Sequence, residues 1–541
     1  MPSRKSKQLK RILVTALILI PVIAFLLWPM SSSEFEIETD PVALKQKQEF
    51  LSSPAETATA PGPNIILITV DDLGMADCSL YGEGDISTPN IDRLGEQGVV
   101  FENAYVTSPV CSPSRAAMIT GRYQQRYGFE FTMQARYLKN RLEYLGFRYF
   151  INSDPWVPKW MSNVPGGEDI LQQGLPLSEV TLAEILKRQG YRTGITGKWH
   201  LGWVDERKPN ALGFDEQYGF FHSHSLYIPE GTPGYVDQEI SGDWTDPHIW
   251  SGQRNGNHAI HRNGKEIKEP GYLTDRITEE SISFIDKNRG QPFFLWVSYS
   301  APHTPLQAPV EYVEKYADIK DPVKRVYSAM IDNLDDNLGR LIAHVDSAGL
   351  AENTLVYFIS DNGGAEYTLT TDNGRYEGGK NTEFEGGVKV PFIMRWTGTI
   401  PSGMRYEPIV SSLDIFPTSA QAADAGVMPG RDIDGVNLVP FVTGSVNDPP
   451  HEYLFWKRGN SKVVRSNEWK LLINDYSGDT LLYNLRENKY EDPDLSASRA
   501  GVTKELNKAY RQWSATHAPP VWPSVIYYIA EKDGKRYYFE Q

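Results

Sequence analysis

The stretch Ser108–Tyr123, SPVCSPSRAAMITGRY, contains one of the two cysteines in this 541-residue chain. Cys111 opens a predicted helix and is followed by Pro113 and Arg115. Within the chain its one candidate disulfide partner is Cys78, since no third cysteine exists. If Cys111 has another role, no intrachain disulfide forms, and Cys78 is then a small buried apolar residue.

Oxygen-bearing side chains follow two apolar runs that are typical of buried strands. Asp71 and Asp72 come after NIILITV, and Asp361 and Asn362 come after NTLVYFIS. Carboxylate and amide oxygens suit a hard cation, and a mixed, irregular set favours Ca²⁺ over Mg²⁺. Each pair also has a structural interpretation, since Asp-Asp can cap a helix and DNGG can form a turn. Matched positions after two strands favour the metal site.

Cationic and imidazole side chains follow the other predicted strands. Lys198 and His200 come after YRTGITG, and His303 comes after PFFLWVSYS. With Arg115 and Lys380, they would form a pocket that binds a tetrahedral oxyanion and stabilises charge developing on it. The structural alternatives are a packing or capping role for His303 and a solvated loop position for Lys380.

Helices and strands must alternate to bring these residues to one rim. The sequence predicts helices that begin at Pro89, after a Thr88 cap, and that cover LSEVTLAEILKRQ, TDRITEESISFIDKNR and VKRVYSAMIDNLDDNLGRLIAHVDS. This order predicts an α/β fold with a large, mainly parallel sheet between helices, where ligands bind beyond the carboxyl ends of strands. Short runs after about His451 predict a smaller antiparallel subdomain with a final helix.

The N-terminal segment and the net charge limit the cellular locations and the partners that we expect for the protein. RKSKQLKR precedes the apolar run ILVTALILIPVIAFLLWPM, a layout typical of a signal peptide or membrane anchor. We therefore expect export, to a periplasmic, membrane-anchored or secreted location. A net charge of −15 argues against nucleic acid as a partner. The expected divisions are a leader or anchor (1–33), a linker (34–63), a catalytic domain (64–445) and a C-terminal subdomain (446–541).

Taken together, these motifs resemble the formylglycine-dependent sulfatases, the type I sulfatases of the alkaline-phosphatase superfamily. The signature Cys-x-Pro-x-Arg is present at 111–115, and Thr-Gly-Arg follows at 120–122. PNIILITVDDLG, GYRTGITGKWHLG, APHTP, ISDNGG and EGGVKVPFIMRW extend the similarity over nearly all of the chain after the linker. The ending LYNLRENKYEDPDLS is looser than the usual family pattern, which leaves the C-terminal boundary open.

The resemblance implies a modified residue and a set of roles. A maturation enzyme would oxidise Cys111 to formylglycine, whose hydrate attacks sulfur, forms a covalent sulfoenzyme and releases sulfate by C–O cleavage. The implied roles of the other residues are Ca²⁺ binding by Asp71, Asp72, Asp361 and Asn362, diol holding by Arg115 and Lys198, a base at His200, and an acid at His303 assisted by Lys380.

Two aromatic-rich segments, 136–160 and 222–250, favour a sulfated carbohydrate as the substrate, although loop packing explains them nearly as well. His222 and His224 lie in the second segment. Two other functions stay open at this point. One is a phosphate or phosphonate ester hydrolase of the same superfamily, and the other is a non-catalytic protein that binds sulfated glycans.

Overall fold

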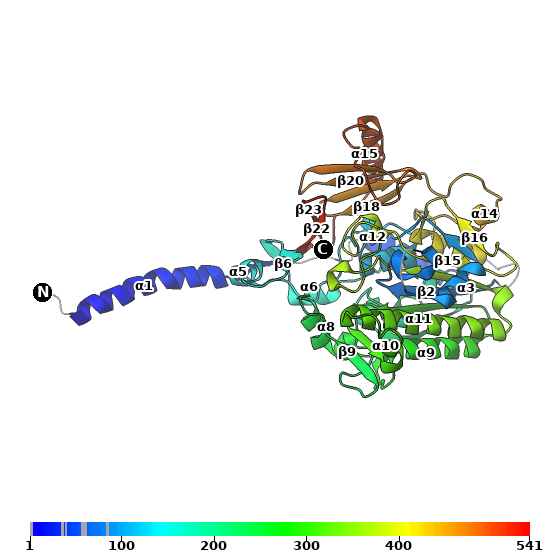
Figure 1. Cartoon of the computed structure of the whole chain (residues 1–541), viewed down its shortest axis with the longest axis horizontal. Coiled ribbons are helices and arrows are strands. Elements are labelled where there is room, and N and C mark those ends of the chain that lie inside the picture. Colours follow the sequence, from blue (N-terminus) through cyan, green and yellow to red (C-terminus); the bar gives the residue numbers. More distant parts are fainter. Residues whose placement is uncertain (1–3, 34–36, 38–39, 56–61, 83–85) are drawn as a thin grey trace.

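A twisted sheet of ten strands forms the centre of the described part of the chain, which in this computed structural model comprises residues 4–33, 37, 40–55, 62–82 and 86–541 (Figure 1). Five adjacent strands, β8 to β14 in the order given next, run parallel and lie in the middle of the sheet. In spatial order the ten strands are β11 (Lys265–Glu266), β10 (His261–Arg262), β8 (Glu216–Phe220), β7 (Arg192–Lys198), β12 (Phe293–Pro302), β2 (Asn64–Asp71), β14 (Thr354–Ser360), β15 (Phe392–Arg395), β3 (Val99–Phe101) and β16 (Met404–Tyr406).

Helices cover both faces of this sheet, which explains why its central strands are continuous apolar runs. Along β2, Ile65 and Leu67 face one apolar cluster, whereas Ile66 and Ile68 face the other. The helices on the Ile66 face include α9 (Leu273–Asn288) and α11 (Pro322–Ser347), and those on the Leu67 face include α4 (Cys111–Thr120), α7 (Leu182–Arg188) and α13 (Ile415–Ala422). The predicted α/β architecture is confirmed. Helix α3 (Pro89–Glu96) begins after Thr88, as predicted.

A smaller antiparallel sheet follows, as expected from the short strand-like runs near the end of the sequence. It contains β18 (Leu454–Arg458), β19 (Ser461–Arg465), β20 (Trp469–Asn474) and β21 (Asp479–Asn484), with α15 (Ala500–Ser514) packed against it. The sequence did not predict that the chain would then return. Strand β22 (Ile526–Lys532) pairs with β23 (Lys535–Glu540) on one side and with β5 (Trp156–Pro158) on the other, which ties the C-terminal strands to the larger part.

Buried charges join the small sheet to the larger part. Lys470 on β20 lies 2.8 Å from Glu385 of α12 (Glu385–Val388) and 2.9 Å from Glu491. The hydroxyl of Tyr105, on β4 (Ala104–Tyr105), donates to Glu385 at 2.8 Å. These four residues are called the junction cluster below, and all are almost completely buried.

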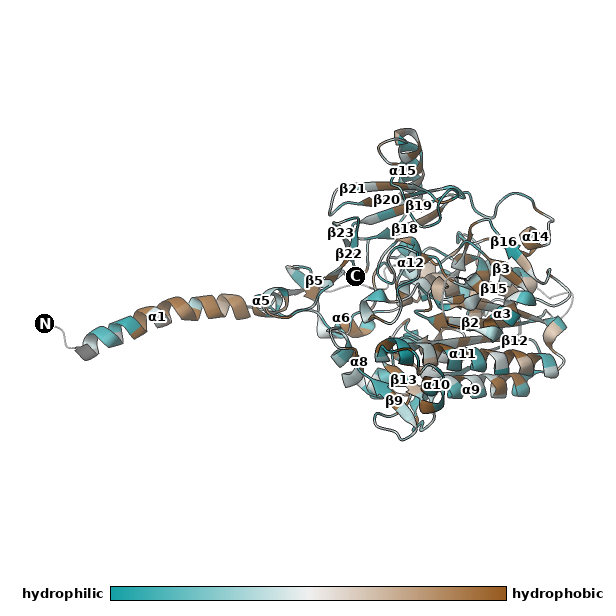
Figure 2. Cartoon of the chain, viewed as in Figure 1, coloured by the Kyte–Doolittle hydropathy of each residue, from teal (hydrophilic) through white to brown (hydrophobic). Residues whose placement is uncertain are grey.

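The first helix, α1 (Arg4–Leu27), projects away from the rest of the molecule, and its apolar residues are exposed (Figure 2). Within residues 6–27, an 18-residue window has a mean hydropathy of 2.3, and the segment is long and apolar enough to cross a membrane, which fits a signal sequence or an anchor. After it, β1 (Ser31–Ser33) pairs with β6 (Asn163–Pro165).

The segment 34–63, predicted to be a linker, contains a helix where the structure describes it. Helix α2 (Pro41–Ser52) is capped by the Asp40 side chain, and its Lys47 is buried 2.8 Å from Glu184 of α7. Residues 34–36, 38–39 and 56–61 of this segment lie outside the described residues. The described part therefore docks on the larger part of the molecule through a buried ion pair.

Candidate active site

The carboxyl ends of β7, β12, β2 and β14 meet at one edge of the sheet, because these four strands are parallel neighbours. Each strand delivers polar residues to that edge, and all of them are buried. The delivered residues are Lys198 and His200 after β7, His303 after β12, Asp71 and Asp72 at the end of β2, and Asp361 and Asn362 after β14. The four strand ends thus bring together residues that lie up to 291 positions apart in the sequence.

Cys111 is the first residue of α4, and its side chain points to this edge. Its Sγ lies 3.4 Å from Asp71 Oδ1. Burial, and then the Asp71 carboxylate, raise the pKa of the thiol well above its usual value. A neutral, buried thiol is a poor nucleophile. Cys78, which is buried, and Cys111 are both free, so no disulfide competes for this sulfur.

Three buried carboxylates each face one buried cation. The pairs are Lys198 Nζ with Asp71 Oδ2 at 2.5 Å, Lys380 Nζ with Asp72 Oδ2 at 2.8 Å, and Arg115 Nε with Asp361 Oδ2 at 2.7 Å. Buried charges are tolerated when they are paired in this way. The pocket around Cys111 therefore holds both signs of charge at close range.

The neighbouring cations decide the ionisation of the two aspartates after β2. Burial alone would raise the pKa of Asp71, but Lys198, His303 and Arg115 together lower it. Burial would likewise raise the pKa of Asp72, and Lys380 and His303 lower it. Both carboxylates are therefore ionised at neutral pH and can act as oxygen donors.

The donor set at this edge fits a hard cation. The Asn362 amide nitrogen donates to Asp72 Oδ1 at 2.7 Å, while its buried Oδ1 has no hydrogen-bond partner within the described part of the chain. Ligand atoms from Asp71, Asp72, Cys111 and His303 also lie within 4.8 Å of one another. An orphaned amide oxygen beside ionised carboxylates is what an oxygen-liganded ion such as Ca²⁺ would satisfy.

The two predicted histidines have different environments. His303 donates its Nδ1 proton to the Thr304 carbonyl at 2.6 Å, which leaves Nε2 facing Asp72 Oδ2 at 3.7 Å. Neither ring nitrogen of His200 has a partner among the residues that the structure describes. Burial, and then Lys198, hold the pKa of His200 well below its usual value, so the ring is neutral and able to accept a proton.

Two non-glycine residues at this edge have a strained backbone. Asp72 and His200 adopt left-handed conformations, with φ of 65° and 57°, although neither is a glycine. Such conformations cost of order 1–3 kcal/mol and persist where surrounding structure imposes them. In both cases the strained residue directs a polar side chain into the pocket just beyond a strand end.

One residue of the pocket was missed by the sequence reasoning. Ser298, within β12, accepts a hydrogen bond from Arg115 NH1 at 2.6 Å and donates to the Lys198 carbonyl at 2.6 Å. A serine inside an otherwise apolar strand, FFLWVSYS, was the available signal. Arg122 of the Thr-Gly-Arg element pairs instead with Glu179 at 3.6 Å.

The glycine between Thr120 and Arg122 has a structural reason. Gly121 ends α4 in a left-handed conformation, with φ of 67°, and a Cβ there would lie 2.7 Å from the Phe416 side chain. Glycine is the residue that adopts this conformation without strain. The helix that carries Cys111 and Arg115 is therefore short and packed directly on α13.

Comparison with known proteins gives a consistent result. The sulfatase family model matches residues 63–425, more than half of the chain. N-acetylgalactosamine-6-sulfatase of Rattus norvegicus is 32% identical over 416 residues, covering 74% of this chain and 69% of the relative. Steryl-sulfatase of Homo sapiens is 31% identical over 459 residues, covering 74% and 73%.

Among solved structures, that of Ps i-CgsB is 32% identical and superposes with a TM-score of 0.71, covering 85% of this chain and 94% of the other. The same protein has also been solved in complex with k-i-k-neocarrahexaose. Phosphonate monoester hydrolase of Agrobacterium radiobacter, at 20% identity and a TM-score of 0.56, shares the fold.

Proposed function

The chain belongs to the sulfatase family and is a sulfuric ester hydrolase, and we propose that it removes sulfate from a carbohydrate, with Cys111 as the precursor of its nucleophile. The observation that carries this proposal is the position of Cys111. Its sulfur lies at the start of a helix, beside Asp71 and within a pocket of buried cations. A sulfate group suits such a pocket because helix N-termini and cations both favour anions.

Conversion of Cys111 to formylglycine removes the difficulty of a neutral thiol with a raised pKa. The hydrated aldehyde supplies an oxygen nucleophile for sulfur and a second hydroxyl whose deprotonation releases the sulfate. A maturation enzyme outside this chain would carry out the oxidation. Beside this position, Arg115 pairs with Asp361 and Lys198 pairs with Asp71. The two cations would orient the hydrate and favour its ionised form.

The two histidines are suited to opposite proton transfers. His303 would give its Nε2 proton to the departing alcohol, since its Nδ1 proton is already committed to the Thr304 carbonyl. Burial and Lys380 lower the pKa of His303 overall, and the nearby Asp72 carboxylate opposes them by favouring the imidazolium that this role requires. His200, neutral and without a partner in the described ranges, would accept the proton of the second hydroxyl. Lys380 would assist His303 and contact sulfate.

We propose Ca²⁺ as the ion held by Asp71, Asp72, Asp361 and Asn362, with Mg²⁺ second. The orphaned Asn362 oxygen and the two ionised aspartates support an oxygen-liganded site. When bound, the ion supplies a Lewis acid for sulfate oxygens and a template that orients the reacting groups. Asp361 is engaged by Arg115 here, so this arginine would share its carboxylate with the ion.

A sulfated carbohydrate is supported by the relatives and by the aromatic loops. N-acetylgalactosamine-6-sulfatase acts, by its name, on a sugar sulfate, and Ps i-CgsB has been solved with an oligosaccharide. Segments 136–160 and 222–250 contact each other through Phe147 and Trp244, whose rings lie edge to face at 4.7 Å. Trp156 is buried in packing, whereas Trp160 is 42% exposed and available to a sugar ring.

We further propose export, with α1 acting as a signal sequence or membrane tether. The exposed apolar surface of α1 and the basic residues at its N-terminal end support this role. The proposed divisions are unchanged, with a catalytic domain over 64–445 and a C-terminal subdomain over 446–541.

A panel of sulfated mono- and oligosaccharides tests the substrate class. We expect turnover of at least one sulfated saccharide and loss of that turnover after chelation and on Cys111→Ala substitution. Turnover of a steroid sulfate but of no saccharide would refute the carbohydrate assignment. Faster hydrolysis of an aryl phosphate or phosphonate than of the matching aryl sulfate would instead favour a phosphoesterase.

A further inference from the structure

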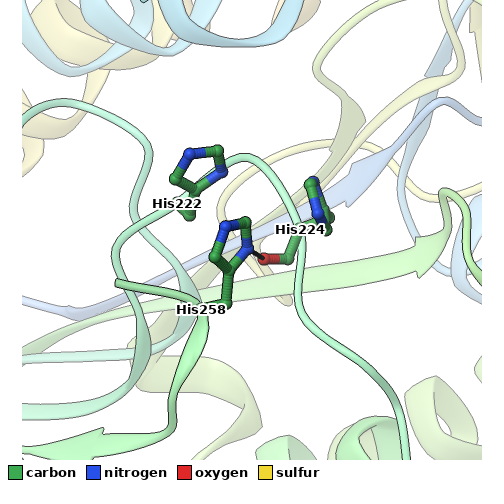
Figure 3. A group of neighbouring side chains, drawn as sticks. All are labelled: His222, His224 and His258. Carbon is green, nitrogen blue, oxygen red and sulfur yellow. Dashed lines mark hydrogen bonds between the residues drawn. The ribbon is translucent and has the colours of Figure 1, made fainter. Parts of the chain in front are cut away.

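Three histidines outside the proposed sulfatase chemistry lie together (Figure 3). Their neighbour His200 places them beside the candidate active site. His222 and His224 follow β8, and His258 ends the short helix η6 (Gly256–His258). Backbone and side-chain hydrogen bonds hold these two segments together. His222 N donates to the Asn257 carbonyl at 3.0 Å, and Ser225 Oγ donates to the His258 carbonyl at 2.7 Å. The three side chains therefore meet because the fold fixes both segments.

The rings are close enough to share one ion. One ring nitrogen from each histidine lies within 4.8 Å of the other two. The ring centroids of His222 and His258 are 3.8 Å apart, and those of His224 and His258 are 4.4 Å apart. Coordinating rings radiate from an ion, so binding would separate His222 from His258, which are stacked here. Side-chain rotation of His222, which is attached to a loop, provides that movement.

A hydrogen bond fixes the tautomer of His258, and Ser223 contacts the other two rings. A carbonyl only accepts, so His258 must carry its proton on Nδ1, which lies 2.8 Å from the His224 carbonyl, and its neutral ring keeps a lone pair on Nε2. Ser223 Oγ lies 2.9 Å from Nδ1 of both His222 and His224. The buried Nε2 of His224 has no hydrogen-bond partner in the part of the chain that is described. Metal-binding histidines are typically oriented by such partners on their other nitrogen.

The protonation state also suits a metal ligand. Burial lowers the pKa of His222 and His224 well below the usual histidine value, and it lowers the pKa of His258 as well. Neutral imidazole is the form that binds metal ions, whereas imidazolium has no free lone pair. The cluster therefore need not release protons to bind a cation at neutral pH.

We propose that His222, His224 and His258 bind one divalent transition-metal ion, Zn²⁺ or an ion with the same preference for imidazole. Three nitrogen donors suit such ions and do not suit Ca²⁺. This second site is thus distinct in chemistry from the oxygen-liganded edge around Asp71. Its existence does not depend on which sulfate ester the enzyme cleaves.

The location of the cluster gives the ion a role at the active site. The His222 ring stacks on Trp203, at 5.5 Å and 5°, and lies nearly parallel to His200 at 6.4 Å. An ion here would add positive charge to the wall that carries His200. Three protein ligands leave a coordination position for water or for an oxygen of a bound anionic saccharide. We therefore expect the ion to lower KM for a polyanionic substrate more than it changes kcat.

Metal titration of the full-length protein tests this site. The protein is stripped with a chelator, saturated with Ca²⁺ to fill the oxygen-liganded edge, and titrated with Zn²⁺ by calorimetry. We expect one Zn²⁺ per chain, with affinity weakened about 10-fold or more by His224→Gln and by His258→Gln. His248→Gln is the matched control, because His248 is an exposed histidine of the neighbouring helix α8 (Asp246–Gly252), and we expect it to bind as wild type.

A spectroscopic measurement on the wild-type protein guards against misfolded variants. X-ray absorption of the zinc-loaded protein should show scattering from about three imidazoles. Absence of Zn²⁺ binding, or a zinc shell without imidazole, overturns the proposal. Unchanged Zn²⁺ affinity in both glutamine variants also overturns it. If those variants bind Zn²⁺ normally but raise KM for the saccharide, the cluster is a sugar-binding surface and the metal proposal is wrong.

Discussion

Two clusters of buried charge lie in this molecule, one at the strand ends around Cys111 and one at the junction between the catalytic part and the small sheet. In the junction cluster, the Lys470 ammonium contacts both Glu385 and Glu491, and the Tyr105 hydroxyl donates a hydrogen bond to the Glu385 carboxylate. Around Cys111 the carboxylates are also paired with cations, but Asn362 Oδ1 and both nitrogens of His200 have neither a hydrogen-bond nor an ion-pair partner among the described residues. Glu491 Oε1 in the junction cluster also makes no hydrogen bond, but the Lys470 ammonium lies 2.9 Å from it.

This difference separates a structural cluster from a functional one. A buried polar atom without a partner costs about 1–3 kcal/mol, so it persists where a ligand will satisfy it or where chemistry needs it. A left-handed backbone at a non-glycine residue occurs in both clusters, at Asp72 and His200 near Cys111 and at Glu491 in the junction, so the atoms without partners carry the distinction. We therefore expect changes around Cys111 to affect turnover more than stability, and changes at the junction to do the reverse.

The largest expected effect is on turnover after Cys111→Ala. Because the variant has no precursor of the nucleophile, hydrolysis of sulfate esters should fall on the order of 10⁴-fold or more. The melting temperature should stay close to that of wild type. Cys78→Ala is the matched control, since Cys78 is the other buried cysteine and lies in the apolar core. Loss of turnover only in Cys78→Ala would reverse the assignment.

At the junction, Lys470→Met should mainly destabilise the fold. Removing one partner of a buried ion pair leaves Glu385 and Glu491 uncompensated, and we expect the free energy of unfolding to fall by about 3–5 kcal/mol. Chemical denaturation measures this change. Lys462→Met on β19 is the control, because its partner Asp475 is exposed and the pair contributes about 0–1 kcal/mol. A folded Lys470→Met protein with lost turnover and full stability would show that the junction cluster serves catalysis and not stability.

Within the active site, His303→Asn distinguishes protonation of the leaving group from a role in binding. If His303 protonates the departing alcohol, turnover of a sugar sulfate should fall about 10²-fold to 10³-fold. An aryl sulfate with a good leaving group needs less protonation, so its turnover should fall far less. Steady-state kinetics on both substrates measures the ratio. An equal loss on both would indicate a role in binding or positioning instead.

The smallest expected effect is a change in the pH dependence of stability. Burial raises the pKa of Glu491 from 4.5 to about 7, with Lys470 opposing the shift and Glu385 adding to it. The folded state therefore binds this proton more tightly than the unfolded state. Its contribution is fully present below pH 4.5 and is lost as pH rises through about 7, a change of about 1–3 kcal/mol.

Glu491→Gln should flatten this part of the stability profile, measured by denaturation at several pH values. Glu487→Gln, at an exposed position on the same loop, should leave the profile as in wild type. A profile that Glu491→Gln does not alter would mean that Glu491 is ionised throughout, like the carboxylates around Cys111.

Much of the fold was predictable because β2, β12 and β14 are buried on both faces and therefore read as continuous apolar runs. The short strands β3, β15 and β16, of three or four residues, show too little periodicity for such a prediction. Helix α2 was missed because its mean hydropathy is close to neutral and polar residues flank it.

The seven residues at strand ends followed from one rule, that polar residues after parallel strands share an edge, whereas Cys111, Arg115 and Lys380 came from sequence motifs elsewhere. The ion pairs between these residues could not be predicted from the sequence, because side-chain packing determines which cation faces which carboxylate. Ser298 lies inside a strand and carries no motif. His258 joins His222 and His224 only through tertiary structure, 34 positions or more along the chain.

The chemical state of residue 111 tests the central claim most directly. We predict that peptide mass spectrometry of catalytically active protein, taken from a host with the maturation enzyme, will show the Cys111 peptide about 18 Da lighter than the encoded thiol. The mass loss should rise in proportion to specific activity across preparations. Full activity in protein whose Cys111 peptide has the unmodified thiol mass would contradict the account.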